Sequence, residues 1–145
     1  MMALDLYMVG LIVEDMEKSL AFYRRLGLDI PEGSEQKTHV ESKMGHGLTF
    51  FLDSKPARWD PEFVRIADSG HTEAPDSYRT VFEFYLKTRA AVEAKYAELM
   101  TFGYQAQRAP YATTFGMCFA MVKDPDGNTI LLSGDLAKNE PVKGD

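Results

Sequence analysis

The sequence is poor in cysteine and in basic side chains, and each shortage excludes a class of protein. Cys118 is the only cysteine, so no disulfide forms within the chain, and its apolar neighbours predict a buried thiol in a reducing compartment. Sixteen Lys and Arg residues stand against twenty-two Asp and Glu residues, for a net charge of −6. No basic stripe runs along the chain, so we expect no binding to nucleic acid.

Long apolar runs are missing as well. None approaches the roughly 20 residues of a membrane-spanning helix, so we expect no membrane partner. The N-terminal segment lacks basic side chains and reaches Asp5 early, which is not the pattern of a secretion signal. These features predict a cytoplasmic protein, and 145 residues are enough for a real hydrophobic core.

The first part of the chain predicts a strand, a helix and three further strands. Residues 6–13 form an apolar run of strand length. Asp15 then suits the N-cap of a helix and Gly27 its C-terminal end. Residues 28–30, 38–41 and 48–52 predict three strands, the last of them the strongest. Together they define a βαβββ module over residues 4–53.

The same order returns in the second part of the chain. Residues 80–86 predict a strand, and Thr88 caps a helix that ends before Gly103. Residues 104–107, 116–122 and 128–132 predict three more strands, with a tight turn at residues 125–127. This second βαβββ module spans residues 78–134, and the linker 54–77 is rich in proline. The repeat predicts an α+β fold in a single domain over residues 1–145.

Four features, in this order, resemble the vicinal oxygen chelate superfamily of glyoxalase I, bleomycin resistance proteins, fosfomycin resistance proteins and extradiol dioxygenases. They are V-E-D-M-E-K-S-L-A-F-Y-R-R-L-G at residues 13–27, the repeated βαβββ plan, the Phe115-Gly116 pair, and D-P-D-G-N at residues 124–128. The resemblance implies that each module curls into a half-barrel, with helices outside and a small-molecule ligand bound in the cleft inside. It also implies a homodimer.

The resemblance further implies where a metal ion would be bound. Metal-dependent members place ligands at the positions of Met8, Val81 and Leu131, and a fourth at Thr49 or Phe51. These side chains are poor donors for a divalent ion, so we expect no metal and no other cofactor. We expect hydrogen-bonded or exposed structural roles for all three histidines (His39, His46 and His71). Cys118 has no evident histidine partner, so no catalytic residue is assigned.

Strand alternation predicts which side chains line the cleft. Val9, Leu11 and Val13 are assigned to the helix side of the first strand, and Met8, Gly10 and Ile12 to the cleft. In the second module, Phe82, Phe84, Leu86, Ile130 and Leu132 are assigned to the helix side. The predicted ligand-binding residues are Met8, Phe51, Trp59, Val81, Glu83, Tyr85, Tyr111, Phe115, Met117 and Leu131.

Two of these residues leave alternatives open. Glu83 either meets a cationic ligand or acts as a base, or else lies at the rim and pairs with Arg79 or Arg89. Trp59 either covers the cleft or a dimer surface, or else packs locally in the linker.

Three functions fit the sequence. The first is a metal-free binding protein, closest to bleomycin resistance proteins, that sequesters a hydrophobic or cationic small molecule in a dimeric cleft. The second is a glyoxalase- or dioxygenase-like enzyme, a lyase or oxidoreductase with displaced or non-metal catalytic residues such as Glu83. The third is a regulatory or structural dimer whose own side chains fill the cleft.

Overall fold

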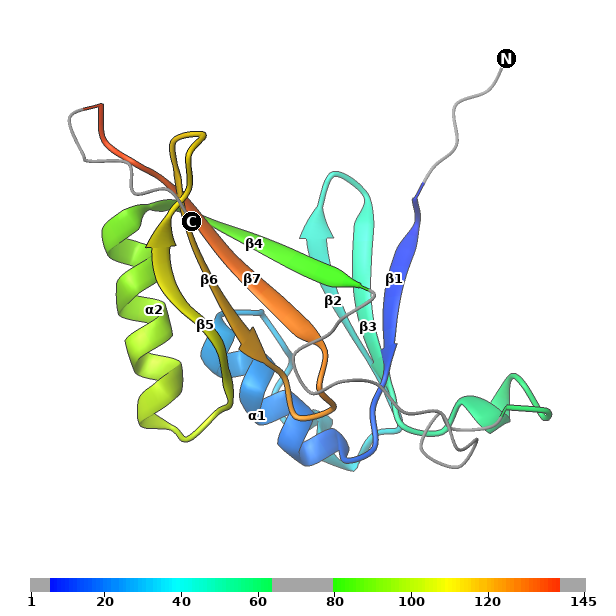
Figure 1. The fold of residues 1–145 in the computed structure, drawn as a ribbon. Helices are drawn as coiled ribbons and strands as arrows, with labels where there is room; N and C mark the ends of the chain where they lie inside the picture. The colour runs from blue at the N-terminus through cyan, green and yellow to red at the C-terminus, as the bar shows by residue number, and fades with distance from the viewer. Residues whose placement is uncertain (1–5, 64–79, 139–145) are drawn as a thin grey trace, which may run out of the picture. The chain divides into compact units, whose positions relative to one another are not determined.

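The computed structural model describes residues 6–63 and 80–138. The chain divides into two compact units, residues 1–72 and 73–145 (Figure 1). Each unit combines one α-helix with one small sheet, which confirms the predicted α+β class. Neither helix within the described ranges is long and apolar enough to cross a membrane.

The first unit holds a three-stranded sheet in the order β1-β3-β2. Strands β1 (Met8–Ile12) and β3 (Leu48–Asp53) run parallel, and β2 (His39–Gly45) runs antiparallel to β3. The loop between β2 and β3 consists of His46 and Gly47, both with positive φ (53° and 80°). This is the backbone geometry that matches the twist of a hairpin.

Helix α1 (Met16–Leu26) begins and ends where its sequence predicts. The Asp15 carboxylate accepts a hydrogen bond from the Lys18 backbone N–H (3.1 Å) and caps the helix. Gly27 ends it with a φ of 125°, which favours glycine. The Tyr23 ring lies 5.4 Å from the Phe50 ring, so the helix packs on the sheet face that carries Phe50.

The strand predicted at residues 28–30 is wrong. The chain there runs irregularly from α1 to the short 3₁₀ helix η1 (Ser34–Gln36). Its carbonyl groups accept hydrogen bonds from side chains instead of from a neighbouring strand: Ser42 Oγ donates to the Asp29 carbonyl (2.9 Å) and Arg24 to the Pro31 carbonyl (2.7 Å). The first unit is therefore βαββ.

The second unit holds a four-stranded sheet in the order β4-β7-β6-β5. Its elements are β4 (Val81–Thr88), α2 (Arg89–Thr101), β5 (Ala106–Ala112), β6 (Met117–Lys123) and β7 (Thr129–Asp135), the predicted βαβββ order. Strands β4 and β7 are parallel, and β5, β6 and β7 are antiparallel neighbours. Strand β5 starts later than predicted and contains Pro110, which an edge strand tolerates.

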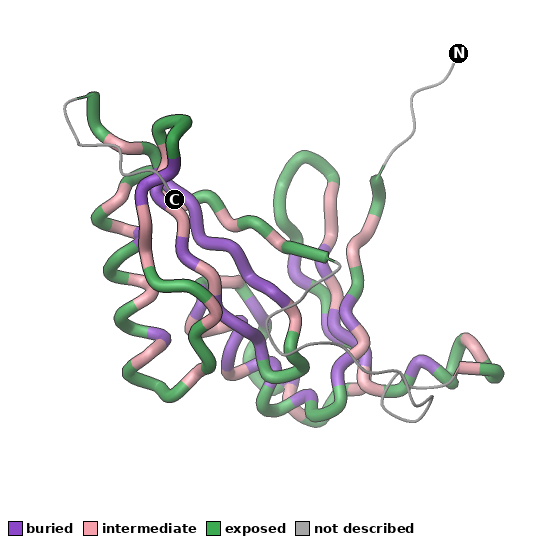
Figure 2. Tube along the Cα trace, viewed as in Figure 1, coloured by how far each residue is buried: buried purple, intermediate pink, exposed green. Residues whose placement is uncertain are grey.

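The core of the second unit lies between α2 and the sheet. Helix residues Val92 and Leu99 are fully buried, as are Ile130 and Leu132 of β7 (Figure 2). Gly134 continues the Ile130 and Leu132 face, and a Cβ atom there would lie 2.4 Å from the Thr88 carbonyl oxygen, at the start of α2. The helix side of this sheet is therefore the one predicted from strand alternation.

The turn before β7 is held by one carboxylate. Asp124 Oδ1 accepts hydrogen bonds from the backbone N–H groups of Asp126 (2.9 Å) and Asn128 (2.8 Å), and Oδ2 accepts one from the Asn128 side chain (2.8 Å). Gly127 has a φ of 86°. The D-P-D-G-N motif thus has a structural role in the turn.

Candidate functional site

The face of the second sheet opposite α2 carries most of the predicted site residues. On β4, Val81, Glu83 and Tyr85 point to this face and are exposed, as alternation predicts. Their partners on β7 are Thr129, Leu131 and Ser133. Six predicted residues therefore share this face by register, from four strands: Val81, Glu83, Tyr85, Leu131, Met117 and Tyr111.

A row of aromatic residues crosses this face. Tyr85 pairs with Ser133, Ser133 with Phe119, and Phe119 with Tyr111, so the row spans all four strands. The rings of Tyr111 and Phe119 are 6.0 Å apart and edge to face, and Phe115 meets Phe119 in the same way at 5.6 Å. Such rings offer both π faces and edges to a flat ligand.

A small cavity opens beside this row. It has a volume of about 130 Å³ and is lined by Tyr111, Thr113, Thr114, Phe115 and Phe119. Phe115 comes from the loop between β5 and β6 and is 67% exposed. The Arg108 guanidinium lies 3.9 Å from the centre of the Tyr111 ring, in cation–π geometry, and so places a positive charge at this edge strand.

Toward the other edge of the sheet, the inner strand β7 presents a carboxylate to the edge strand β4. The Tyr85 hydroxyl donates a hydrogen bond to the Asp135 carboxylate, which raises the pKa of Tyr85 above its usual value. A β-bulge between Tyr85 and Thr88, with Lys87 at a φ of 77°, shifts the register beside this pair. Arg89 pairs with Glu93 in its own helix (3.3 Å), whereas Arg79 lies outside the described residues, so the rim pairing proposed for Glu83 stays open.

Ser133 stands between Tyr85 and Phe119 in the aromatic row. It is fully buried, and its hydroxyl has no hydrogen-bond partner among the described residues. A buried hydroxyl without a partner is uncommon and costs stability.

The first sheet also has a face directed away from its helix. Met8, Gly10 and Ile12 of β1 lie on this face, beside Thr49, Phe51 and Asp53 of β3. The Phe51 ring lies across Gly10, where a Cβ atom would be only 1.9 Å from Phe51 Cζ. Glycine at position 10 therefore makes room for the Phe51 ring.

His39 forms the centre of a polar cluster on the same face. Its Nδ1 lies 2.9 Å from Asp53 Oδ2, and its Nε2 lies 2.9 Å from Glu41 Oε2. The imidazole ring also stacks on Phe51, with ring centres 5.0 Å apart. Partial burial on its own lowers the pKa of His39, but the hydrogen bonds to Glu41 and Asp53 outweigh this effect and raise the pKa above its usual value.

Asp53 is the buried anchor of this cluster. Its side chain is 5% exposed and accepts hydrogen bonds from the Lys55 backbone N–H (2.8 Å) and the Trp59 indole N–H (3.2 Å), besides His39. Burial on its own raises the pKa of Asp53, but the hydrogen bonds from His39, Trp59 and Lys55 lower it below its usual value. Trp59 is thus held to the sheet by its indole N–H group, although the residue as a whole is 59% exposed.

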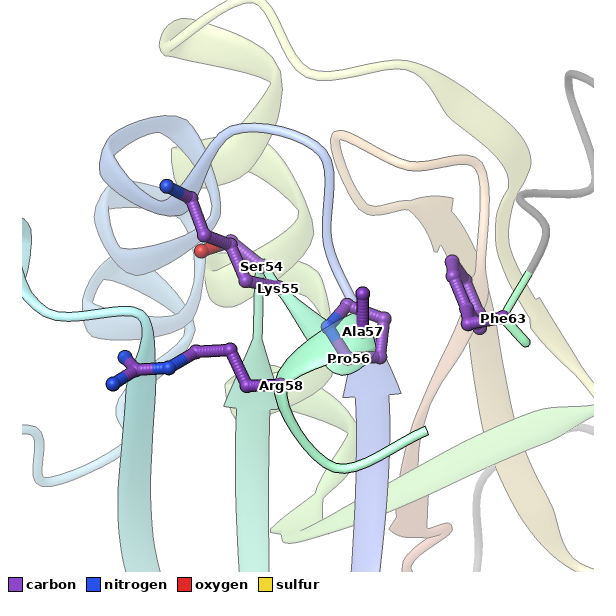
Figure 3. A pocket seen from close by; sticks show the side chains of 6 residues that line it. All are labelled: Ser54, Lys55, Pro56, Ala57, Arg58 and Phe63. Atoms are coloured by element: carbon purple, nitrogen blue, oxygen red, sulfur yellow. The ribbon is translucent and has the colours of Figure 1, made fainter. Parts of the chain in front are cut away.

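The segment after β3 folds into the short 3₁₀ helix η2 (Pro56–Arg58) and borders an open cavity of about 470 Å³. Ser54, Lys55, Pro56, Ala57, Arg58 and Phe63 line it (Figure 3). Arg58 donates a hydrogen bond to the Thr38 hydroxyl (2.7 Å), whereas Phe63 lies on the other side of Pro56 and Ala57. The predicted linker is described only as far as Phe63.

The residues at the expected metal positions do not fit a divalent ion. The side chains at three of these positions, Met8, Val81 and Leu131, offer only hydrocarbon and one thioether. The fourth position, if it is Phe51, is filled by an aromatic ring packed on Gly10. Among residues 6–63 and 80–138, no three His, Cys, Asp or Glu side chains are grouped to hold a metal.

Several residues of both faces were not among the predicted ligand-binding residues: Phe119, Ser133, Asp135, His39, Glu41 and Asp53. Phe119, Ser133 and Asp135 follow from the alternation that places Leu131 and Met117 on this face. His39 and Glu41 alternate in the same way along β2, but their meeting with Asp53 depends on the hairpin register. His71 lies outside the described residues.

Comparison with known proteins identifies the fold. Residues 5–132 match the model of the glyoxalase/bleomycin resistance protein/dioxygenase superfamily. A family enzyme from Burkholderia phytofirmans PsJN superposes with a TM-score of 0.71 at 19% identity, covering 92% of this chain and 100% of that one. A glyoxalase-related enzyme from Fulvimarina pelagi gives 0.68 at 17% identity, covering 96% and 92%.

A lactoylglutathione lyase from Agrobacterium tumefaciens gives a TM-score of 0.60 at 17% identity, covering 90% of this chain and 92% of that one. No curated protein sequence matches the chain. At such low identities the solved structures support the fold alone, while the family model spans most of the sequence. The chain belongs to the glyoxalase/bleomycin resistance protein/dioxygenase superfamily.

Proposed function

We propose that this protein binds a hydrophobic or cationic small molecule without a metal ion, as a cytoplasmic homodimer that sequesters its ligand. The observation that carries the proposal is the aromatic row of Tyr85, Phe119 and Tyr111 with the adjoining cavity at Phe115. Apolar surfaces with few polar groups are typical of small-molecule sites. The carboxylates of Glu83 on β4 and Asp135 on β7 suit a ligand that carries a positive charge.

The residues at the metal positions support the same proposal. A binding protein needs no Lewis acid, so Met8, Val81 and Leu131 can serve as apolar lining. Elemental analysis of the purified protein tests this part directly. We expect no stoichiometric metal and no change of melting temperature with a chelator, whereas a full equivalent of Zn, Ni, Mn or Fe would overturn it.

Ligand binding is tested with three probes: bleomycin, the planar cation ethidium, and the aromatic anion 8-anilinonaphthalene-1-sulfonate. We expect saturable, stoichiometric binding of at least one cation by calorimetry, with the probe recovered unchanged. At 100 times its Kd a ligand stabilises the folded state by about 2.7 kcal/mol, a readily measured thermal shift. Failure of all three probes to bind contradicts the proposal, and binding of the anion alone contradicts its charge preference.

The dimer is tested separately by sedimentation at micromolar concentration. We expect a species of twice the 16.3 kDa chain mass. A monomer that still binds the probes would overturn the dimer while leaving the binding proposal intact.

A further inference from the structure

The His39 cluster differs from an ordinary surface ion pair in how its hydrogen bonds are distributed. Both ring nitrogens lie 2.9 Å from oxygens of different carboxylates. An ionised carboxylate only accepts hydrogen bonds, so both nitrogens must carry a proton and the ring is an imidazolium. The cluster therefore holds an acid, His39 Nε2–H, directly beside a base, the Glu41 carboxylate.

The two halves of the cluster differ in exposure. Asp53 is 5% exposed and held by three hydrogen bonds, so it fixes the orientation of the ring through Nδ1. The side chains of His39 and Glu41 are 42% and 45% exposed, so this half of the cluster faces solvent and a ligand can approach it. A buried carboxylate that orients an imidazole whose second nitrogen is accessible is the arrangement used for proton transfer.

The cluster also has an apolar platform. The Phe51 ring stacks on His39 and is seated on Gly10, so an aromatic surface extends from the acid–base pair along the sheet. A ligand with an aromatic group has a place to lie next to Nε2.

We propose that His39 and Glu41 form a metal-independent proton-transfer site that catalyses keto–enol tautomerisation of aromatic carbonyl compounds, with Asp53 as its positioning residue. Two neighbouring groups, one acidic and one basic, match a reaction in which a proton leaves a carbon atom and another reaches the adjacent carbonyl oxygen. This goes beyond ligand sequestration, because it assigns chemistry to the face of the first sheet.

The proton transfer balances without any co-reactant. Glu41 removes a proton from the carbon next to the carbonyl, the C–H electron pair becomes the C=C bond, and the carbonyl π pair moves to oxygen. That oxygen takes the proton of His39 Nε2, which leaves the enol, a neutral imidazole and a protonated Glu41. Since Nε2 and Glu41 Oε2 are 2.9 Å apart, the Glu41 proton then passes to Nε2 and restores both groups.

The charged groups around His39 come from three elements. Glu41 and Lys43 share its face of β2, Asp53 ends β3, and Lys55 and Arg58 belong to the η2 segment. Arg58 is held by Thr38. Both carboxylates contact the ring directly, so they govern the state of His39.

The experiment follows hydrogen exchange of phenylacetone and phenylpyruvate in D₂O by ¹H NMR. Exchange of the CH₂ protons beside the carbonyl reports enolisation, and positioned acid–base groups typically accelerate such steps about 10²–10⁴-fold. We expect the wild-type protein to accelerate exchange of at least one compound by about 10²-fold over the same concentration of free imidazole. Exchange no faster than with free imidazole, for both compounds, overturns the proposal.

Matched variants assign the chemistry to the cluster. His39→Asn keeps a side-chain N–H for Asp53 but removes Nε2, and Glu41→Gln keeps the size but removes the base. We expect each to lose at least ten-fold of the acceleration while melting cooperatively. His46→Asn, the same change in the exposed hairpin loop, should leave the rate unchanged. Full activity of His39→Asn, or an equal loss in His46→Asn, overturns the assignment.

The role of Asp53 is tested by the pH dependence of the exchange rate. If Asp53 served only the fold, Asp53→Asn would reduce the amount of folded protein and leave this pH dependence unchanged. We expect Asp53→Asn to shift the profile of the remaining exchange activity to lower pH, since the imidazolium loses its buried counter-charge. An unchanged profile in a folded Asp53→Asn protein contradicts the positioning role. Binding of the sequestration probes is measured by calorimetry, separately from this exchange assay. Either proposal can therefore be contradicted without the other.

Discussion

His39 Nδ1 and Asp53 Oδ2 lie 2.9 Å apart, across the residue pair that opens β2 and closes β3. The two-residue loop at His46 and Gly47 and the register shift between Lys43 and Gly45 together set this pairing, and a slip by one residue would turn His39 to the other face. The His39–Asp53 ion pair therefore forms only when β2 and β3 pair in this register.

The first prediction concerns the pH dependence of stability. The raised pKa of His39 contributes stability that is complete below the ordinary value of 6.5 and is lost as pH rises through the folded pKa. The lowered pKa of Asp53 contributes stability that is present above 3.8 and is lost as pH falls through its folded pKa. We expect the free energy of unfolding lost in His39→Asn to be largest between these two values.

The measurement is urea unfolding of wild type and His39→Asn across pH 3 to 9, with NMR titration of His39 and His46. His39 should titrate above 6.5, and Glu41→Gln should bring its pKa down. Asp53→Asn removes a buried charge that accepts three hydrogen bonds, so we expect a loss of about 1–3 kcal/mol. A loss that does not vary with pH would contradict the ion pair.

The second prediction concerns Gly10 and Phe51. Gly10→Ala places a Cβ atom 1.9 Å from the present position of Phe51 Cζ, so the ring must turn away from the sheet. We expect a loss of about 1–3 kcal/mol from this overpacking, and loss of the stacking between Phe51 and His39. Urea unfolding measures the first effect and the NMR shifts of His39 the second.

A double-mutant cycle provides the control. In a Phe51→Ala background the ring is gone, so Gly10→Ala should cost much less than it does in the wild type. Equal costs in both backgrounds would show that the ring does not lie across Gly10.

How far the sequence predicts this structure depends on the range of the interactions involved. Asp15, Gly27 and Gly127 act on their own neighbours, and their roles were predicted correctly. Alternation likewise placed Tyr85 and Leu131 on one face. The strand predicted at residues 28–30 is absent because a weak strand pattern needs a partner strand, and here side chains donate hydrogen bonds to the carbonyl groups of Asp29 and the adjoining Pro31 instead.

The candidate site was predictable only where alternation alone decides it. His39 was assigned a hydrogen-bonded or exposed role, and the hydrogen bonds are confirmed. Glu41 lies two residues away on the same strand, as alternation allows, but Asp53 lies 14 residues away and the Trp59 N–H comes from the segment after β3. Spacing along the chain therefore gave no sign of the complete cluster. The predictions of a lid or dimer role for Trp59 and of a base role for Glu83 stay predictions.

The third prediction concerns the aromatic row. Phe119→Ala removes the ring that Tyr111 and Phe115 both meet, so we expect the affinity for the bound cationic probe to fall by about 5- to 30-fold, equivalent to about 1–2 kcal/mol. Phe102→Ala is the matched control, because Phe102 is an exposed phenylalanine at the end of α2. Calorimetry should show wild-type affinity for the control; equal losses in both variants would place the ligand elsewhere.

The fourth prediction separates two buried serines. Ser42 donates a hydrogen bond to the Asp29 carbonyl (2.9 Å), whereas the Ser133 hydroxyl has no partner among the described residues. Replacing a hydrogen-bonded hydroxyl leaves a carbonyl unsatisfied, so Ser42→Ala should cost about 1 kcal/mol of unfolding free energy. Ser133→Ala removes a buried hydroxyl that makes no hydrogen bond to the described residues. We therefore expect the free energy of unfolding to stay unchanged or to rise by up to about 1–3 kcal/mol.

Urea unfolding of both variants without ligand measures this contrast, and calorimetry with the cationic probe adds a second readout. Ser133 lies between Tyr85 and Phe119, so a ligand that draws these rings apart would reach its hydroxyl. In that case Ser133→Ala should weaken binding while leaving the free protein as stable as wild type or more so. A destabilised Ser133→Ala protein would mean that the hydroxyl is already satisfied, and it would remove Ser133 from the candidate ligand surface.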